Sequence, residues 1–201
     1  MENNTELEKK NHPVAKSKWK EHAANAWDLV KFAAIALAIV IPIRLFVAQP
    51  FVVSGESMYP TFDNNQYLII DELSYIVSSP HRGDVVVFRY PNDPSRFFIK
   101  RLIGLPDEKI QIKNGVVTIF NKDHPEGFTL DEPYIDQPFS TTQDYTTGDN
   151  EYFVMGDNRN ESSDSRIWGN VPAKLMIGRV YLRLLPLKVM SYLPGYFKEP
   201  N

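Results

Sequence analysis

Ser57 and Lys100 are the two residues of this 201-residue chain whose types could together carry out hydrolytic chemistry. Ser57 lies between Gly55 and Pro60 in the stretch VSGESMYPTF. A serine hydroxyl is too weakly acidic to attack an amide unaided, so a nucleophilic Ser57 requires a base elsewhere in the chain. Without such a base, a serine beside glycine and proline is more commonly a turn residue that bonds its own backbone. The first question is therefore which residue supplies the base.

Lys100 is the strongest candidate for that base. In the run FFIKRLI, strand alternation places Lys100 on the same face as the apolar Phe98 and Leu102, and Arg101 points the other way. A free lysine with a pKa of about 10.4 is neutral in only about one molecule in 2,500 at pH 7. Burial among apolar neighbours can lower that pKa by about 3–5 units, which would let Lys100 accept the Ser57 proton. The alternative is a lysine whose stem packs on the sheet while its ammonium group reaches solvent.

The four histidines are weaker candidates for a base. His81 and His124 stand beside prolines in expected turns, and His12 and His22 precede the long apolar run of the chain. None of them has the sequence context of a nucleophile elbow or of an orienting acid. A Ser-His-Asp triad therefore stays an alternative without specific support.

A polar segment at residues 156–169, GDNRNESSDSRIWG, lies between two apolar runs. Asp164 and Arg166 could form an ion pair that fixes this segment, and a hydroxyl such as Ser162 could bond the lysine amine and aim its lone pair. The alternative is a solvated surface turn, which is common for segments so rich in small polar residues.

Composition excludes several classes of function. The net charge of −3 and the absence of a long basic block beyond the apolar run argue against a nucleic-acid partner. The chain contains no cysteine, so disulfides, zinc–thiolate sites, iron–sulfur clusters and a thiol nucleophile are excluded. A serine–lysine mechanism needs no metal or cofactor, and we expect neither.

Residues 29–48, LVKFAAIALAIVIPIRLFVA, have the length and apolarity of a transmembrane helix. Trp27 precedes the run where interfacial aromatic residues collect, and lysines cluster before the run. We expect an uncleaved, single-pass anchor in the cell membrane, with a polar cytoplasmic tail at residues 1–28 and an extracytoplasmic catalytic domain at residues 49–201. A buried core helix is the alternative, although the run lacks the polar stripe that such a helix normally shows.

The rest of the chain is typical of strands. A β-branched run spans residues 85–88, and residues 109–113 and 116–120 flank Asn114-Gly115, the strongest hairpin signal in the sequence. Short strands are also expected at residues 67–70, 151–155 and 177–185, with an irregular excursion at residues 121–150. The fold class expected is mainly β, a barrel or sandwich catalytic domain with one N-terminal transmembrane helix.

These motifs together resemble the bacterial type I signal peptidases, the membrane-anchored serine proteases that remove signal peptides from exported proteins. The apolar run is followed in order by SGESMYPT, RGDVVVF, IKRLIGLP and GDNRNESSDSR, and the resemblance covers nearly the whole chain outside residues 121–150. The single anchor and short length are more similar to the Gram-positive members. The resemblance implies Ser57 as nucleophile, Lys100 as general base, Ser162 as the hydroxyl that orients the lysine, and Asp164 with Arg166 as the supporting pair.

Two positions depart from that family pattern. Gly55 stands where some members have a serine that helps to bind the oxyanion, and Asp107 stands where the family commonly has a glycine in GLPGD. The resemblance also implies signal peptides of exported preproteins as partners, cleaved after small residues. We expect the substrate to dock as an extended strand at Phe51 and Val53, with shallow pockets near Val53 and Met58.

Two further functions stay open from the residues alone. Self-cleaving repressors also use a serine–lysine dyad in a β domain, but they need a DNA-binding helix-turn-helix where this chain has an apolar run. A non-catalytic, membrane-anchored β domain that binds exported chains is the other alternative.

Overall fold

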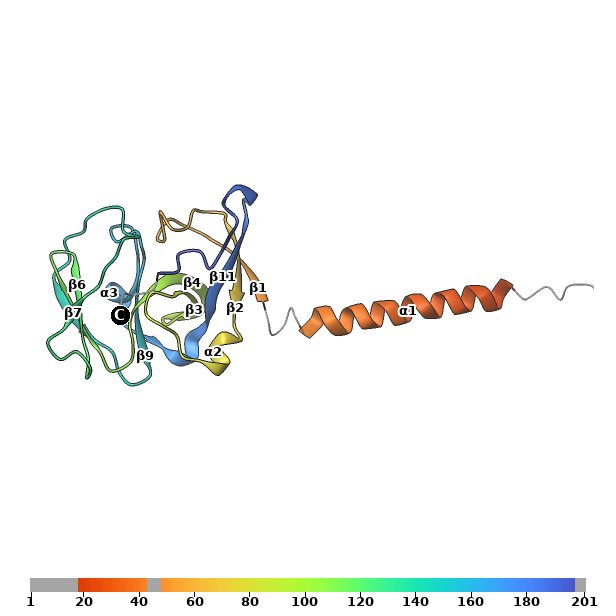
Figure 1. Ribbon diagram of the computed structural model, residues 1–201, viewed down its shortest axis with the longest axis horizontal. Coiled ribbons are helices and arrows are strands. Elements are labelled where there is room, and N and C mark those ends of the chain that lie inside the picture. Colours follow the sequence, from red (N-terminus) through yellow and green to blue (C-terminus); the bar gives the residue numbers. More distant parts are fainter. Residues whose placement is uncertain (1–17, 43–47, 198–201) are drawn as a thin grey trace, which may run out of the picture. The chain divides into compact units, whose positions relative to one another are not determined.

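The computed structural model describes residues 18–42 and 48–197, and the chain divides into two compact units, Met1–Ile43 and Arg44–Asn201. The described part of the first unit is the helix α1 (Lys18–Pro42) (Figure 1). Residues 29–42 of the predicted span belong to α1, residues 43–47 lie outside the described residues, and Ala48 opens the first strand. Among residues 18–42 and 48–197, no helix is both long enough and apolar enough to span a membrane.

The second unit is built mainly of strands. Its larger sheet has the strand order β1-β2-β11-β3-β4-β9-β10, and β12 pairs with β11 outside this path. The pairs along it are antiparallel. Its strands are β1 (Ala48–Val52), β2 (Tyr67–Asp71), β3 (Val85–Tyr90), β4 (Asp93–Gly104), β9 (Glu151–Met155), β10 (Val171–Pro172), β11 (Met176–Leu185) and β12 (Ser191–Tyr192).

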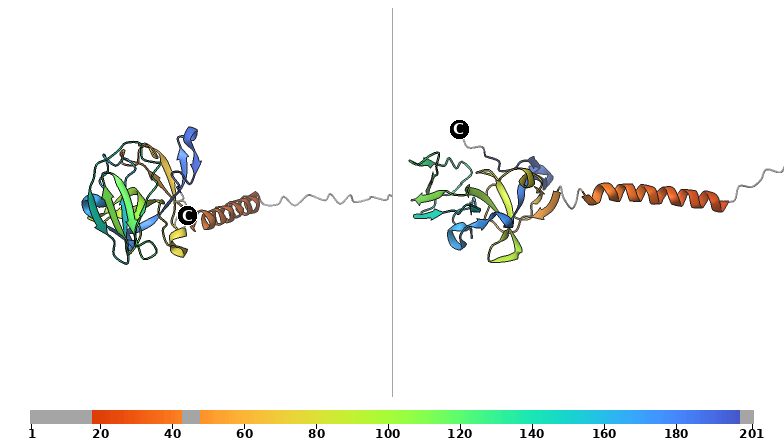
Figure 2. Two further views of the ribbon diagram at one scale, coloured as in Figure 1. Left: turned by 60° about the vertical axis from the view of Figure 1, so that its left-hand side comes forward. Right: turned by 90° about the horizontal axis from the view of Figure 1, so that it is seen from below.

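A smaller sheet has the order β7-β6-β5-β8. It contains β5 (Lys109–Lys113), β6 (Val116–Phe120), β7 (Phe128–Thr129) and β8 (Gln143–Thr146). Figures 1 and 2 show β6 and β7 on one side of this unit and β1, β2 and β11 on the other. Short helical turns connect the strands: α2 (Ser74–Val77), α3 (Ser165–Trp168), η2 (Ala173–Leu175) and η3 (Leu187–Val189).

Three buried apolar clusters hold the second unit together. One lies at the smaller sheet around Ile110, Ile112 and Phe153. The second includes Met58, Phe62 and residues of β2 and β3 and lies under the loop that carries Ser57. The third packs β3, β4 and β9 against the aromatic rings of Phe98 and Trp168. The strands that carry the site are therefore supported from more than one side.

The predicted mainly β fold is confirmed, and the predicted barrel is not closed. β1 and β10 end the larger sheet without pairing with each other, so the sheet keeps two edges. The Asn114-Gly115 hairpin is confirmed, with Lys113 opposite Val116. At Asp107, where the family commonly has glycine, the backbone has a φ of 60°, so the turn keeps the left-handed conformation that glycine usually supplies.

Candidate active site

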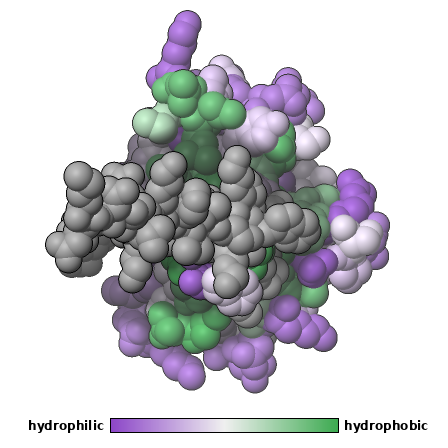
Figure 3. All heavy atoms as spheres, turned by 90° about the vertical axis from the view of Figure 1, so that its right-hand side faces the viewer, coloured by the Kyte–Doolittle hydropathy of each residue, from purple (hydrophilic) through white to green (hydrophobic). Residues whose placement is uncertain are grey.

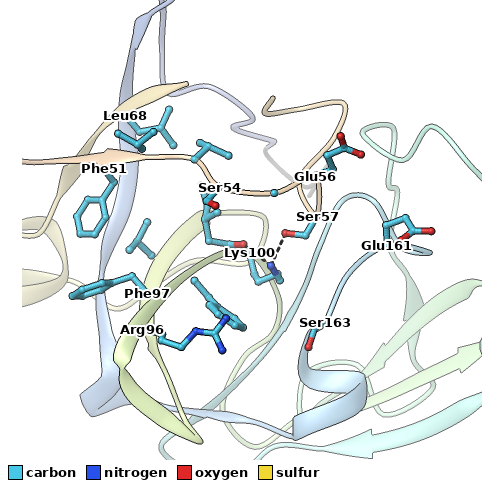
Figure 4. Close-up of a pocket in the computed structure, with 16 residues that line it drawn as sticks. Phe51, Ser54, Glu56, Ser57, Leu68, Arg96, Phe97, Lys100, Glu161 and Ser163 are labelled. Carbon is cyan, nitrogen blue, oxygen red and sulfur yellow. Dashed lines mark hydrogen bonds between the residues drawn. The ribbon is translucent and has the colours of Figure 1, made fainter. Parts of the chain in front are cut away.

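The structure brings Ser57 and Lys100 into direct contact. Lys100 Nζ lies 2.7 Å from Ser57 Oγ and donates a second hydrogen bond of 2.9 Å to the carbonyl oxygen of Ile99 (Figure 4). Lys100 comes from the middle of β4, and Ser57 from the loop between β1 and β2. The two predicted residues, 43 positions apart in the sequence, therefore lie within the distance at which a proton can pass between them.

Lys100 is buried, with 4% of its surface exposed. This burial lowers the pKa of Lys100 from its ordinary 10.5 to about 8, and the negative charges of Asp164 and Asp157 oppose part of that change. The Phe98 ring lies 5.4 Å from Lys100 Nζ, as the strand alternation predicted. A lysine with a pKa of about 8 is neutral in about one molecule in ten at pH 7, so it can act as a base.

The loop that carries Ser57 is held by hydrogen bonds across the loop and by packing of Met58 in the core. Val53 N donates to the carbonyl oxygen of Gln66, and Gly55 N donates to Asn64 Oδ1 at 3.0 Å. Met58, only 1% exposed, packs in the core beneath the loop. Gly55 has a φ of 91°, a conformation that favours glycine, although a side chain there would meet no atom within 4 Å. Ser57 therefore lies in a loop held by hydrogen bonds and by core packing, and it lines the cavity next to this loop.

The dyad opens into a cavity of about 560 Å³. Of the three residues predicted to bind substrate, Phe51 and Val53 line this cavity. Met58 does not line it, because its side chain is buried in the core. Figure 4 shows Phe51 and Phe97 at one end and Glu161 at the other. The remaining lining residues are Val52, Ser54, Gly55, Glu56, Ser57, Leu68, Val87, Arg96, Phe98, Ile99, Lys100 and Ser163.

Asp164 and Arg166 form the predicted ion pair. Arg166 Nη2 lies 2.8 Å from Asp164 Oδ2, and Asp164 is fully buried. The same carboxylate caps α3 by accepting from the backbone N–H of Arg166, and it also accepts from the backbone N–H of Gly156 at 3.0 Å. Arg166 in turn donates to the carbonyl oxygen of Arg159. The pair therefore ties both ends of the polar segment together, next to Lys100.

Ser162 is buried on this segment, and its Oγ has no hydrogen-bond partner among the described residues. A side chain on Gly156 would lie 2.2 Å from Ser162 Oγ and 2.3 Å from the Ser57 carbonyl oxygen, so glycine is required where the segment passes the nucleophile. The predicted hydrogen bond from Ser162 to the lysine amine is not formed in this structure. The buried, unsatisfied hydroxyl nevertheless lies beside the dyad.

A buried ion pair between Arg101 and Asp157 was missed by the sequence reasoning. Both side chains have no exposed surface, and Arg101 Nη2 and Nε lie 2.6 and 2.8 Å from the two carboxylate oxygens. Thr61 Oγ1 also donates to Asp157, at 2.5 Å. A buried arginine in an apolar strand needs an acidic partner, so the position of Arg101 in the sequence could have predicted a buried carboxylate beside it. The pair joins β4, the Ser57 loop and the segment that begins at Gly156.

The backbone N–H of Ser57 donates no hydrogen bond to any described residue. The carbonyl oxygen of the same peptide, that of Glu56, accepts from Tyr59 N at 3.1 Å and from Asn158 Nδ2 at 3.2 Å. The next peptide is held by Asn158 N, which donates to the Ser57 carbonyl oxygen at 3.1 Å. A free N–H at the nucleophile is the donor that an oxyanion requires.

Comparison with known proteins identifies the family of this chain. The family model "Signal peptidase, peptidase S26" matches residues 26–185. "Probable signal peptidase I-1" of Synechocystis is 34% identical over 186 residues, covering 87% of this chain and 92% of the relative. "Signal peptidase I" of Bacillus caldolyticus is 33% identical over 192 residues, covering 88% and 98%. "Signal peptidase I" of Leptolyngbya laminosa is 37% identical over 183 residues, covering 83% and 85%.

A solved structure, a signal peptidase I of Enterococcus faecalis, is 30% identical and covers 51% of this chain and 97% of its own, with a TM-score of 0.43. The family match spans more than half of the chain, and the relatives exceed 30% identity over most of it. The chain belongs to the signal peptidase family, peptidase S26.

Proposed function

We propose that this protein is a serine endopeptidase that cleaves signal peptides from exported preproteins. The observation that carries the proposal is the contact of 2.7 Å between Ser57 Oγ and a buried Lys100 whose pKa is lowered to about 8. The relatives named signal peptidase I support the substrate class.

In the proposed mechanism, neutral Lys100 takes the proton of Ser57 as Ser57 Oγ attacks the scissile carbonyl carbon. The negative oxygen of the tetrahedral intermediate is stabilised by the free N–H of Ser57. Lys100 then gives its proton to the leaving amine, and an acyl-enzyme remains. Water, deprotonated by the same amine, attacks the ester and releases the signal peptide and the free Ser57 hydroxyl.

Ser162, Asp164 and Arg166 act in this proposal as positioning residues. The Lys100 ammonium has three donors, and Ser57 and Ile99 accept two of them. A small movement of the buried Ser162 hydroxyl would let it accept the third and direct the lone pair of the neutral amine at Ser57. The Asp164–Arg166 pair holds the segment on which Ser162 lies.

The substrate docks as an extended strand beside Phe51 and Val53, with its main chain bonded to the edge that β1 leaves open. The walls near these residues are largely apolar and include Leu68, Val87 and Ile99. Such a surface admits small, uncharged side chains before the scissile bond. Met58 contributes by supporting the loop from the core.

A direct test is to incubate the detergent-solubilised full chain with a synthetic precursor peptide and to map the cut by mass spectrometry. We expect one cut after a small residue, and no cut with Ser57→Ala. Retained cleavage by Ser57→Ala, with its fold intact, would contradict the assignment.

The two alternatives predict different outcomes. A non-catalytic domain would form no acyl-enzyme, whereas we expect a serine-directed acylating inhibitor suited to a lysine-based site to label Ser57. A self-cleaving repressor would cut its own chain, whereas we expect the full chain to stay intact on prolonged incubation while it cleaves the precursor.

We also propose that the chain works at the cell membrane, held there by residues 29–48 with the second unit outside. In support, the described part of this run exposes large apolar side chains, such as Phe32 at 71% and Leu29 at 69%. The second unit exposes further ones on α2 and η3, including Val77 at 86% and Leu187 at 72%. Figure 3 shows hydrophobic side chains gathered in patches on one face of the molecule, between hydrophilic ones.

Membrane fractionation tests this localisation. We expect the full chain to sediment with membranes and to resist alkaline extraction, and a variant with both Phe32→Lys and Ile39→Lys to be released. Protease added outside intact spheroplasts should cleave the second unit but not the tail at residues 1–28. Release of the unmodified chain by alkali would contradict the anchor.

A further inference from the structure

Four charged side chains line the cavity, and they are distributed unevenly about Ser57. They are Glu56, Arg96, Lys100 and Glu161. Figure 4 shows Glu56 and Glu161 on one side of the dyad and Arg96, beside Phe97, on the other. The end of the cavity away from Phe51 and Phe97 is therefore acidic.

The direction of the substrate follows from the proposed function, on which this inference rests. A peptide that passes through the site crosses Ser57 once, so the residues before and after the scissile bond lie on opposite sides of the nucleophile. The residues before the bond are small and uncharged, and the apolar rings of Phe51 and Phe97 suit them, although Arg96 lies beside Phe97. The residues after the bond must then leave past Glu56 and Glu161.

The side chains of both glutamates are unpaired within the part of the chain that the structure describes. Neither Glu56 nor Glu161 forms an ion pair or a side-chain hydrogen bond with the described residues, although their backbones are fixed. The Glu56 carbonyl oxygen accepts from Tyr59 N and Asn158 Nδ2, and Glu161 N donates to the Asn158 carbonyl oxygen. The backbones that carry the two carboxylates are thus both hydrogen-bonded to Asn158.

The positive charge on the other side is held away from them. The Arg96 guanidinium lies 5.3 Å from the Phe98 ring and 5.9 Å from the Tyr90 ring. Such contacts between cations and aromatic faces fix the guanidinium on β4. Arg96 therefore does not neutralise the acidic end.

We propose that Glu56 and Glu161 select substrates by the charge of the first residues after the scissile bond, favouring a basic residue and disfavouring an acidic one. A cation there is attracted by two negative charges, and an anion is repelled by the same two. Because both glutamates are exposed, the effect is modest and depends on salt.

The test uses three synthetic precursors that differ only in the second residue after the scissile bond: Lys, Gln or Glu. At low ionic strength we expect kcat/KM to fall in that order, with about a tenfold difference between the Lys and Glu peptides. In about 1 M salt the difference should largely disappear, because the Debye length shrinks to about 3 Å. Equal rates at low salt would overturn the proposal while leaving the peptidase function intact.

Substitutions at Glu56 and Glu161 test whether these two residues cause the preference for the Lys peptide. Glu161→Gln and Glu56→Gln should each reduce the Lys-to-Glu ratio about threefold, and Glu161→Lys should bring it to one or below. The matched control is Glu126→Gln, an exposed glutamate that does not line the cavity, and it should leave the ratio unchanged. An unchanged ratio in all three site variants would overturn the proposal. Failure of the unmodified protein to cut any of the three peptides would instead count against the proposed function.

Discussion

Lys100 and Arg101 are neighbours on β4, and both are buried, yet their side chains meet different partners on the two faces of the strand. On one face Arg101 meets the carboxylate of Asp157 with two hydrogen bonds and gives two more to the carbonyl oxygens of Gly83 and Gly195. On the other face Lys100 has no carboxylate within ion-pair distance among the described residues, and its hydrogen-bond partners are a hydroxyl and one carbonyl.

The difference shows how two neighbouring residues of one strand have separate roles: Arg101 stabilises the fold, and Lys100 is the candidate base. A buried cation with a bidentate carboxylate keeps its charge and fastens the elements around it. A buried amine without such a partner loses part of its preference for the charged form, and its pKa falls to about 8. The residue types match these roles, because a lysine can give up its proton at neutral pH and an arginine cannot.

The largest expected effect comes from Lys100→Met, which keeps the length of the side chain and removes the base. We expect kcat/KM for a precursor peptide to fall about 10³-fold or more, as for other losses of a member of a catalytic pair. The fold should remain, because no charge is left buried without a partner. Circular dichroism and urea unfolding check the fold, and cleavage above a tenth of the normal rate would contradict the role of Lys100.

The same substitution one residue later, Arg101→Met, should have the opposite profile. It leaves the Asp157 carboxylate buried without its cation, and we expect the free energy of unfolding to drop by about 3–5 kcal/mol. Urea unfolding of this variant and of Lys100→Met, side by side, measures the contrast. A smaller loss at Arg101 than at Lys100 would refute the comparison.

A double variant sharpens the result. Adding Asp157→Leu to Arg101→Met removes both charges, and we expect it to recover a large part of the lost stability. Thr61 would then lose its acceptor on Asp157, so the recovery should be incomplete.

Ser162→Ala should have an intermediate effect. We expect kcat to fall about 10- to 100-fold, because misdirecting a catalytic group costs less than removing it. The free energy of unfolding should change little, since Ser162 Oγ makes no hydrogen bond with the described residues that the alanine could lose. Ser163→Ala, an exposed neighbour that lines the cavity, is the matched control and should reduce kcat far less. Equal losses in both variants would contradict a specific role for Ser162.

The fold was predictable where the local pattern was strong. The β-branched run at residues 85–88 and the Asn114-Gly115 hairpin are strands in the structure because their residues are buried on alternating or on both faces. The number and closure of the sheets were not predictable, since they depend on pairings such as β4 with β9, for example Arg101 with Met155, between residues far apart in the sequence. The short turns α2 and α3 were also missed, because four residues carry no helical period.

For the site, residue type alone left a solvated Lys100 as the more common outcome, and the ordered motifs shared with the family led to the prediction that Ser57 and Lys100 meet and that Asp164 pairs with Arg166. Met58 was misplaced, because a residue next to a nucleophile can face either the cavity or the core, and the pattern of one loop does not decide between them. Asp157 was missed because its partner is distant in sequence. The charges of Glu56 and Glu161 gained meaning only when the cavity showed on which side of Ser57 they lie.

The smallest expected effect concerns the pH at which Lys100 works. Only the neutral amine accepts the Ser57 proton, so kcat/KM should rise with pH through an inflection near 8, the pKa of Lys100. The negative charge of Asp164 raises that pKa, so Asp164→Asn, which keeps a capping side chain for α3, should move the inflection to lower pH while reducing the maximal rate. A pH–rate profile of both proteins with one precursor measures this. A shift to higher pH would contradict the assignment, because removing the negative charge of Asp164 should lower the pKa of Lys100.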